Sequence, residues 1–233
     1  MAQWLTAARH HPSAVLLGAQ LAGVVIYPFL GESAGGRALV SLFGLFVLVL
    51  AVWTIRTTPA LVWVAILLGL PVAVLTVLEA LNPSTQLVLW SSVLHAAFYF
   101  YAAYGLLRYM FNDRRVTTDE LFATGATFTV LAWAFAYLYV AIQVIWPGSF
   151  TAALEPETPR TWIELLFLSF TNLSSTGLSD VAPVQPHARS VVMIEQVAGL
   201  GYIALVVARL VGLTLWRPTP TSGKEATSRD GTS

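Results

Sequence analysis

Long apolar runs dominate this chain and limit what it can fold into. A run of about 17 to 25 apolar residues crosses a bilayer as a helix, because each unpaired backbone group in hydrocarbon costs several kcal/mol. The 233 residues are 57% hydrophobic and only 10% charged, unlike a soluble domain. We therefore expect an all-α membrane protein with six transmembrane helices, at about 13–30, 38–54, 60–81, 87–111, 121–146 and 187–216.

Composition and motifs exclude several classes of function. The chain contains no cysteine, which rules out disulfides, thiolate metal sites and thiol nucleophiles. Its formal net charge of zero gives no signature of nucleic-acid binding. There is no HExxH, no nucleophile elbow and no phosphate-binding glycine loop. We predict that the protein is not an enzyme, needs no cofactor and binds no identifiable soluble ligand.

The basic residues predict an orientation, since Lys and Arg are enriched on the cytoplasmic side of membrane proteins. If the N-terminus is inside, three basic residues fall outside, namely Arg37, Arg160 and Arg189. The others fall on or near the cytoplasmic side: Arg9, Arg56, Arg108, Arg114, Arg115, Arg209, Arg217, Lys224 and Arg229. We expect a multi-pass protein of the plasma membrane with both termini cytoplasmic and its first apolar run retained.

The segment between the fifth and sixth runs differs from the rest. "TWIELLFLSFTNL" is too short to span and is typical of a re-entrant helix, with Glu164 placed to complement its dipole. It leads into residues 174–180, here called the polar strip. Non-helical backbone at membrane depth is tolerated where it lines a wet cavity, and its carbonyls can replace the hydration shell of a cation. The alternative is a re-entrant hairpin that packs two helices, with Gly177 as a tight turn.

The order of parts resembles the pore of the tetrameric potassium channels: an outer helix, a loop, a short helix, a strip ending in Asp, a Pro, and an inner helix with Gly. The family filter Thr-Thr-Val-Gly-Tyr-Gly-Asp aligns with Ser174-Ser175-Thr176-Gly177-Leu178-Ser179-Asp180, with two of seven residues identical. Gly199 follows Arg189 by ten residues, as the hinge glycine of the family's inner helix does. The resemblance covers about 116–215.

The resemblance implies a homotetramer in the lipid bilayer that passes K⁺. Residues 1–115 would be a four-helix domain like a voltage sensor, 116–216 the pore domain and 217–233 a disordered cytoplasmic tail. Ions would be bound by carbonyls of Ser174, Ser175, Thr176, Gly177, Leu178 and Ser179, with the Ser175 hydroxyl also contributing. Asp180 would order the outer mouth, Gly199 would be the hinge, and Thr171 and Glu195 would support the filter. Helix packing is the alternative role for both Gly199 and Glu195.

Departures from the family keep other functions open. Leu178 replaces a tyrosine that can donate a hydrogen bond, and Ser179 replaces a glycine, which costs about 1 to 2 kcal/mol if that position is left-handed. The alternatives are a non-selective monovalent cation channel and a non-conducting, channel-like regulatory or interaction subunit. The fourth run carries only His95 well inside and Arg108 near its cytoplasmic end, so we predict weak or absent voltage dependence.

Overall fold

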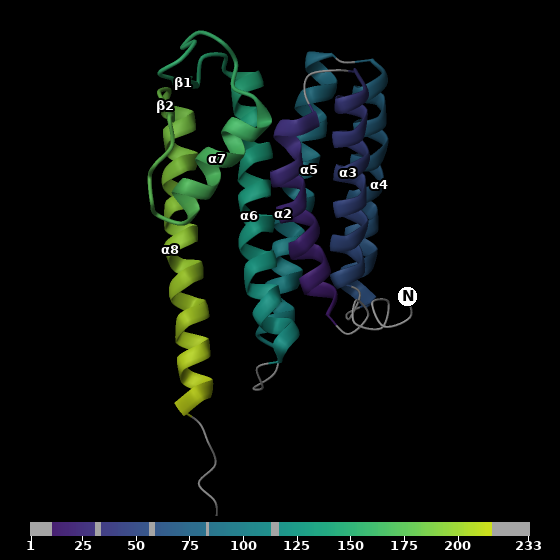
Figure 1. Cartoon of the computed structure of the whole chain (residues 1–233), viewed down its shortest axis with the longest axis vertical. Helices are drawn as coiled ribbons and strands as arrows, with labels where there is room; N and C mark the ends of the chain where they lie inside the picture. Colours follow the sequence, from purple (N-terminus) through teal and green to yellow (C-terminus); the bar gives the residue numbers. More distant parts are fainter. Residues whose placement is uncertain (1–10, 31–33, 56–58, 83, 113–116, 216–233) are drawn as a thin grey trace, which may run out of the picture.

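A computed structural model describes residues 11–30, 34–55, 59–82, 84–112 and 117–215. Long helices run side by side, and a short helix and two short strands lie at one end (Figure 1). The predicted 115/116 boundary and the predicted tail lie outside the described residues. The helices are α2 (Pro12–Leu30), α3 (Ala34–Ile55), α4 (Pro59–Leu81), α5 (Thr85–Met110), α6 (Thr118–Ile145), α7 (Trp162–Leu173) and α8 (Pro186–Leu215).

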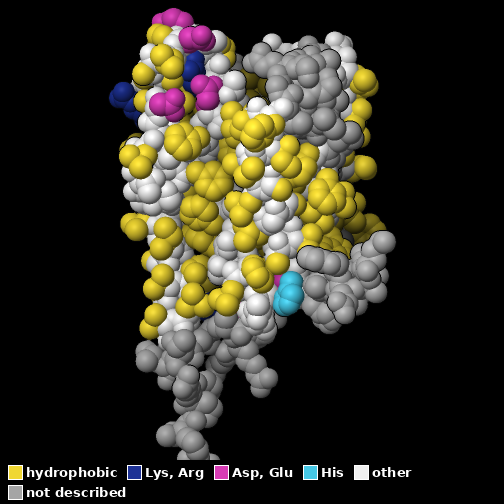
Figure 2. All heavy atoms as spheres, in the orientation of Figure 1, with side chains coloured by type: hydrophobic (Ala, Val, Ile, Leu, Met, Phe, Trp, Pro, Cys, Tyr) yellow, Lys and Arg dark blue, Asp and Glu magenta, His cyan; other side chains and the backbone are white. Residues whose placement is uncertain are grey.

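The molecule is an all-α membrane protein. Within the described part of the chain, 5 helices are long and apolar enough to cross a bilayer: α2, α4, α5, α6 and α8. The segment expected at 38–54 is also helical, within the 22 residues of α3. Hydrophobic side chains cover most of the visible flank, and acidic and basic ones gather mainly at the end that carries the strands (Figure 2).

Helix α2 packs along α6 and joins the four-helix part of the bundle to the rest. Ser13 Oγ donates to Asp119 Oδ2 at 2.9 Å, and Thr129 Oγ1 donates to Gln20 Oε1 at 2.6 Å. All four side chains are buried. The two α2 residues are seven apart, which places them on one face of the helix. These polar contacts inside an apolar bundle fix the relative position of the two helices.

The short strands close the loop that contains α7 and the polar strip. β1 (Phe150–Ala152) pairs antiparallel with β2 (Val181–Pro183), with Phe150 opposite Pro183. These three-residue strands were not predicted. Helix α7 begins with a capping box, in which Thr161 N donates to Glu164 Oε2 at 2.6 Å and Glu164 N to Thr161 Oγ1 at 3.4 Å. The dipole-complementing role predicted for Glu164 is therefore confirmed.

Candidate functional site

The polar strip begins as the C-terminal cap of α7. Ser174 is the C-cap, and Ser175 follows with φ of 60°. Thr176 N donates to Thr171 O at 2.9 Å, and Ser175 N donates to Asn172 O at 3.0 Å. This pair of bonds around a left-handed residue is the Schellman motif, where glycine is the usual residue. Serine in that conformation costs about 1 to 2 kcal/mol.

The backbone strain therefore lies at Ser175 and not at Ser179, the position considered in the sequence. Among the described non-glycine residues, positive φ occurs at Glu155 and Ser175. Ser179 does not need a left-handed backbone because its hydroxyl turns the chain in another way: Ser179 Oγ accepts from Val181 N at 3.0 Å. The left-handed position within the strip's outer half is Gly177, with φ of 65°.

The carbonyl of Thr171 accepts several hydrogen bonds from the first residues of the strip. It accepts from Thr176 N and Gly177 N at 2.9 and 3.1 Å, and from the hydroxyls of Ser174 and Thr176 at 3.3 Å each. In a trans peptide the C=O points opposite to the N–H. The carbonyls of Ser175 and Thr176 therefore point away from α7. The hydroxyl of Thr176 thus also has a hydrogen-bond partner in the cap.

An open hollow with a volume of about 520 Å³ lies beside Ser175 and Gly177 of the strip. Polar backbone and side chains of α7 and the strip form one wall, and mainly apolar side chains of α8 form the other. Asn172 and Gln196 were not among the predicted site residues, and Gln196 Nε2 lies 3.5 Å from Asn172 Oδ1. The lining residues are Thr171, Asn172, Ser175, Gly177, Met193, Gln196, Val197 and Leu200.

The outer half of the strip is exposed in a single chain. Leu178 is 78% exposed, and Gly177 and Asp180 are also exposed. A Cβ added to Gly177 would meet nothing within 4 Å, so its glycine is required by backbone conformation and not by space. The exposed surface of this part of the strip thus includes backbone and the apolar side chain of Leu178.

Comparison with known proteins agrees with this layout. Residues 125–214 match the family model described as an ion channel. The matched region runs from α6 through α7 and the polar strip to α8, and it covers less than half of the chain. No curated protein and no solved structure matches the sequence. The protein therefore carries an ion-channel domain of the pore-loop type and is a transport protein, not an enzyme.

Glu195 joins three helices of the ion-channel domain. Its side chain is 0% exposed and accepts hydrogen bonds from Tyr139 of α6 and Ser169 of α7. Ser169 Oγ also lies 2.9 Å from Ala132 O of α6. Ser169 is two residues before Thr171, whose carbonyl organises the strip. This geometry favours the bracing role for Glu195, and the partners Tyr139 and Ser169 were missed because sequence spacing alone does not pair them.

Gly199 lets α8 approach the end of α7. A Cβ placed there would lie 2.1 Å from the carbonyl oxygen of Leu173, too close for any side chain. Gly201, two residues later, has nothing within 4 Å of an added Cβ. The helix α8 runs unbroken through both positions. Close packing is therefore a role of Gly199 in the ion-channel domain, and a hinge there stays a prediction.

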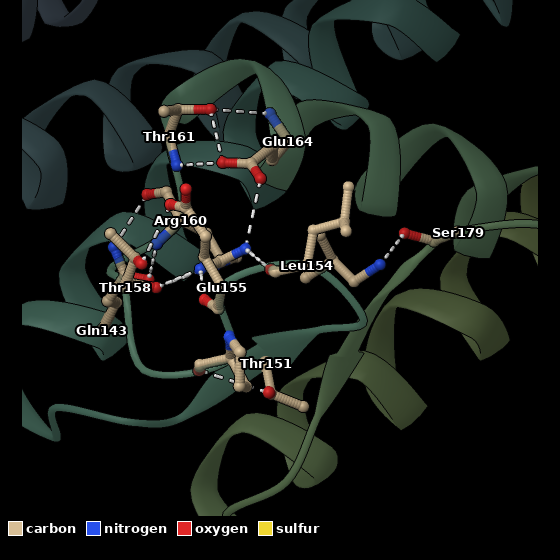
Figure 3. A network of polar contacts seen from close by, with 11 residues as sticks. Gln143, Thr151, Leu154, Glu155, Thr158, Arg160, Thr161, Glu164 and Ser179 are labelled. Carbon is tan, nitrogen blue, oxygen red and sulfur yellow. Dashed lines mark hydrogen bonds and ion pairs between the residues drawn. The ribbon is translucent and has the colours of Figure 1, made fainter.

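Arg160 organises the loop between β1 and α7 (Figure 3). It is 6% exposed although it was expected only as an outside basic residue. Its backbone N donates to Gln143 Oε1 at 2.7 Å, and its backbone O accepts from Gln143 Nε2 at 2.9 Å. The guanidinium donates to the carbonyls of Leu154 at 3.3 Å, Glu155 at 2.5 Å and Thr158 at 2.9 Å, and to Glu164 Oε1 at 3.3 Å.

Proposed function

We propose that this protein is a homotetrameric potassium channel of the plasma membrane, not gated by voltage, with both termini in the cytoplasm. The observation that carries the proposal is the pair of consecutive carbonyls, Ser175 and Thr176, directed away from α7 in a strip whose residues Ser175 and Gly177 line an open hollow. Rings of carbonyls replace the hydration shell of a cation. The C-terminal end of α7, with its partial negative charge, favours a cation at the same place.

A ring of carbonyls requires several copies of the chain, and α8 offers a surface for them. Within its membrane-spanning window only 22% of α8 is buried. Three of its four residues beside the hollow are apolar and exposed, with Met193 at 58%, Val197 at 73% and Leu200 at 64%. These side chains belong to the same face as the polar strip, so copies that meet around the strip also cover them.

In this proposal the ion path is lined by the polar strip, mainly through carbonyls of Ser174 to Ser179. Ser175 adds its hydroxyl, and Asp180 orders the outer mouth. Thr171 and Glu195 support the filter from behind, Thr171 through its carbonyl and Glu195 through Ser169. The hinge of the inner helix is Gly199.

A non-selective monovalent cation channel is the second candidate, and Ser175 favours it. Ser175 is strained, and Ser179 stands where the family filter has glycine. The spacing of the carbonyl rings can therefore differ from that of the family filter. A wider ring would pass Na⁺ and K⁺ alike. A channel-like subunit that does not conduct is the third outcome.

Flux in liposomes separates these candidates. Purified tetramers are reconstituted, and uptake of K⁺, Rb⁺ and Na⁺ is measured side by side under an imposed gradient. Uptake of K⁺ and Rb⁺ well above the uptake of Na⁺ supports the potassium channel. Equal uptake supports the non-selective pore, and no uptake from folded tetramers supports the non-conducting subunit.

Gly177→Ala tests the filter assignment. The change strains a left-handed position in the strip by about 1 to 2 kcal/mol per subunit and should abolish or alter flux while tetramers still form. The control is Gly148→Ala, which carries the same kind of strain at φ of 74° in the outer loop, where a Cβ meets only Gln185 at 3.9 Å. If the parent and both variants show the same flux, the strip does not line the ion path.

A further inference from the structure

The half of α8 that lies away from α7 is fastened to α6 at two points. Tyr202 OH donates to the carbonyl of Thr124 at 2.5 Å. Two turns further on, Arg209 Nη2 lies 2.8 Å from Glu120 Oε2, with the two side chains 10% and 6% exposed. The Arg209 guanidinium also lies 5.0 Å from the centre of the Phe111 ring. A buried ion pair near the free end of a helix holds that end in one position.

The start of α6, on the other side of this contact, is itself attached to α2 and α5. Asp119, next to Glu120, accepts from the backbone N and the hydroxyl of Ser13 in α2 at 3.1 and 2.9 Å, and from Tyr109 OH in α5 at 3.1 Å. The two adjacent carboxylates therefore bind different helices. Asp119 fixes the start of α6 to the four-helix part of the bundle, and Glu120 holds α8.

The opposite face of this half of α8 is apolar and exposed. Leu200 is 64% exposed, Val207 52% and Val211 50%. Burying such side chains gains about 25 cal/mol per Å² of apolar surface. When copies of the chain assemble around the polar strip, this gain draws the ends of α8 toward one another. The attachment to α6 opposes that movement.

We propose that the Arg209–Glu120 pair is a latch that holds the end of α8 against α6 and so keeps the ion path open at the end opposite the polar strip. The proposal rests on the proposed function, since it needs copies of α8 around a common path. Breaking the latch lets the apolar faces meet and closes that end.

Flux and charge exchange test the latch. Glu120→Gln and Arg209→Gln should each lower K⁺ uptake by about tenfold or more in liposomes, because either change removes the ion pair that holds α8 against α6. The exchange Glu120→Arg with Arg209→Glu should restore most of the uptake, and Arg209→Lys should retain part of it. Arg108→Gln, which removes an exposed charge at the last turn of α5, is the matched control and should leave uptake unchanged.

A distance measurement tests the latch without conduction. Because the chain has no cysteine, Ala208→Cys gives a single site for a spin label on the exposed surface of α8. Distances between labels in the tetramer should shift to shorter values in Glu120→Gln and return in the charge exchange. Unchanged distances with unchanged flux would overturn the latch. Shortened distances in a tetramer that carries no ions would keep the latch and overturn the proposed function.

Discussion

Ser175 occupies a backbone position that would suit glycine better. It is the left-handed residue of the cap that ends α7, and its side chain is exposed. Nothing in the cap itself requires the hydroxyl, since the bonds that close it come from backbone groups and from Ser174 and Thr176. A strained residue held by its surroundings at a candidate ion path suggests that the hydroxyl serves the ion.

Ser175→Gly should stabilise the fold while changing transport. Relief of the left-handed strain, less the added freedom of the unfolded chain, should raise the free energy of unfolding by about 1 kcal/mol per chain. Ser174→Gly is the contrast, because Ser174 has φ of −81°, gains nothing from glycine and loses its hydroxyl bond to Thr171 O, so it should lower the stability. Thermal unfolding in detergent checks the sign. A lower unfolding temperature for Ser175→Gly would contradict the strain.

At the scale of the element, α7 is held at both ends. Its first residue, Trp162, packs against Trp133 and Tyr137 of α6 and Tyr27 of α2, with ring centroids 5.2, 5.7 and 5.8 Å apart. Its last turn touches α8 at Gly199. A short helix needs such support, because its own length gives few contacts.

Gly199→Ala should separate α7 from α8. The added Cβ would lie 2.1 Å from a backbone oxygen, which cannot move aside as a flexible side chain can, so we expect a loss of about 1 to 3 kcal/mol or more. Gly201→Ala, two residues away with open space around it, should be neutral or stabilising by up to about 1 kcal/mol. Unfolding temperature and tetramer yield measure both. Equal behaviour of the two variants would be inconsistent with the packing described.

Arg160→Met should loosen the outer loop. It removes a buried guanidinium that satisfies three backbone carbonyls and Glu164, and hydrogen bonds to charged groups contribute about 1.5 to 3 kcal/mol each. A glutamate-specific protease should then cut after the exposed residue Glu157 at least several-fold faster. Arg189→Met is the control, since Arg189 is exposed and its side chain donates to Pro183 O at 3.2 Å. Similar cleavage rates in both variants would show that Arg160 does not hold the loop.

The helices could be predicted from the sequence because each is a long apolar run bounded by polar or turn residues. The short helix and the start of the polar strip followed from the same contrast, and Gly177 was identified as a backbone position. The cap at Ser175 could not be predicted, since serine is an unusual choice there. The pairs Ser13 with Asp119 and Tyr139 with Glu195 join residues 106 and 56 apart, and no local pattern encodes such contacts.

At the scale of the whole molecule, the four-helix part is attached to α6 and carries little charge at membrane depth. His95 is 5% exposed and stacks on Tyr137 of α6 with ring centroids 4.3 Å apart, so it packs inside the bundle. Arg108 lies exposed in the last turn of α5. A voltage sensor needs about three or four charges per subunit that cross the field.

Currents through the reconstituted protein should therefore rise roughly in proportion to voltage. Planar-bilayer recordings between negative and positive potentials measure this, with the parent protein compared with His95→Gln, which removes the ionisable ring of the buried histidine. We expect no change in voltage dependence in that variant. A steep rise of current over a few tens of millivolts in the parent would contradict the prediction.

The contacts between α2 and α6 also set the order of events during synthesis. Gln20 meets Thr129, a residue 109 positions later, so α2 cannot take its final place until α6 has been made. At about 5 to 20 residues per second, that delay is roughly 5 to 20 s. During this interval Gln20, in the middle of α2, lacks its final partner. Helix α2 then lies in lipid, at the membrane surface or beside a membrane chaperone. Helix α2 is thus made before α6 but reaches its final contacts only after α6 has been made.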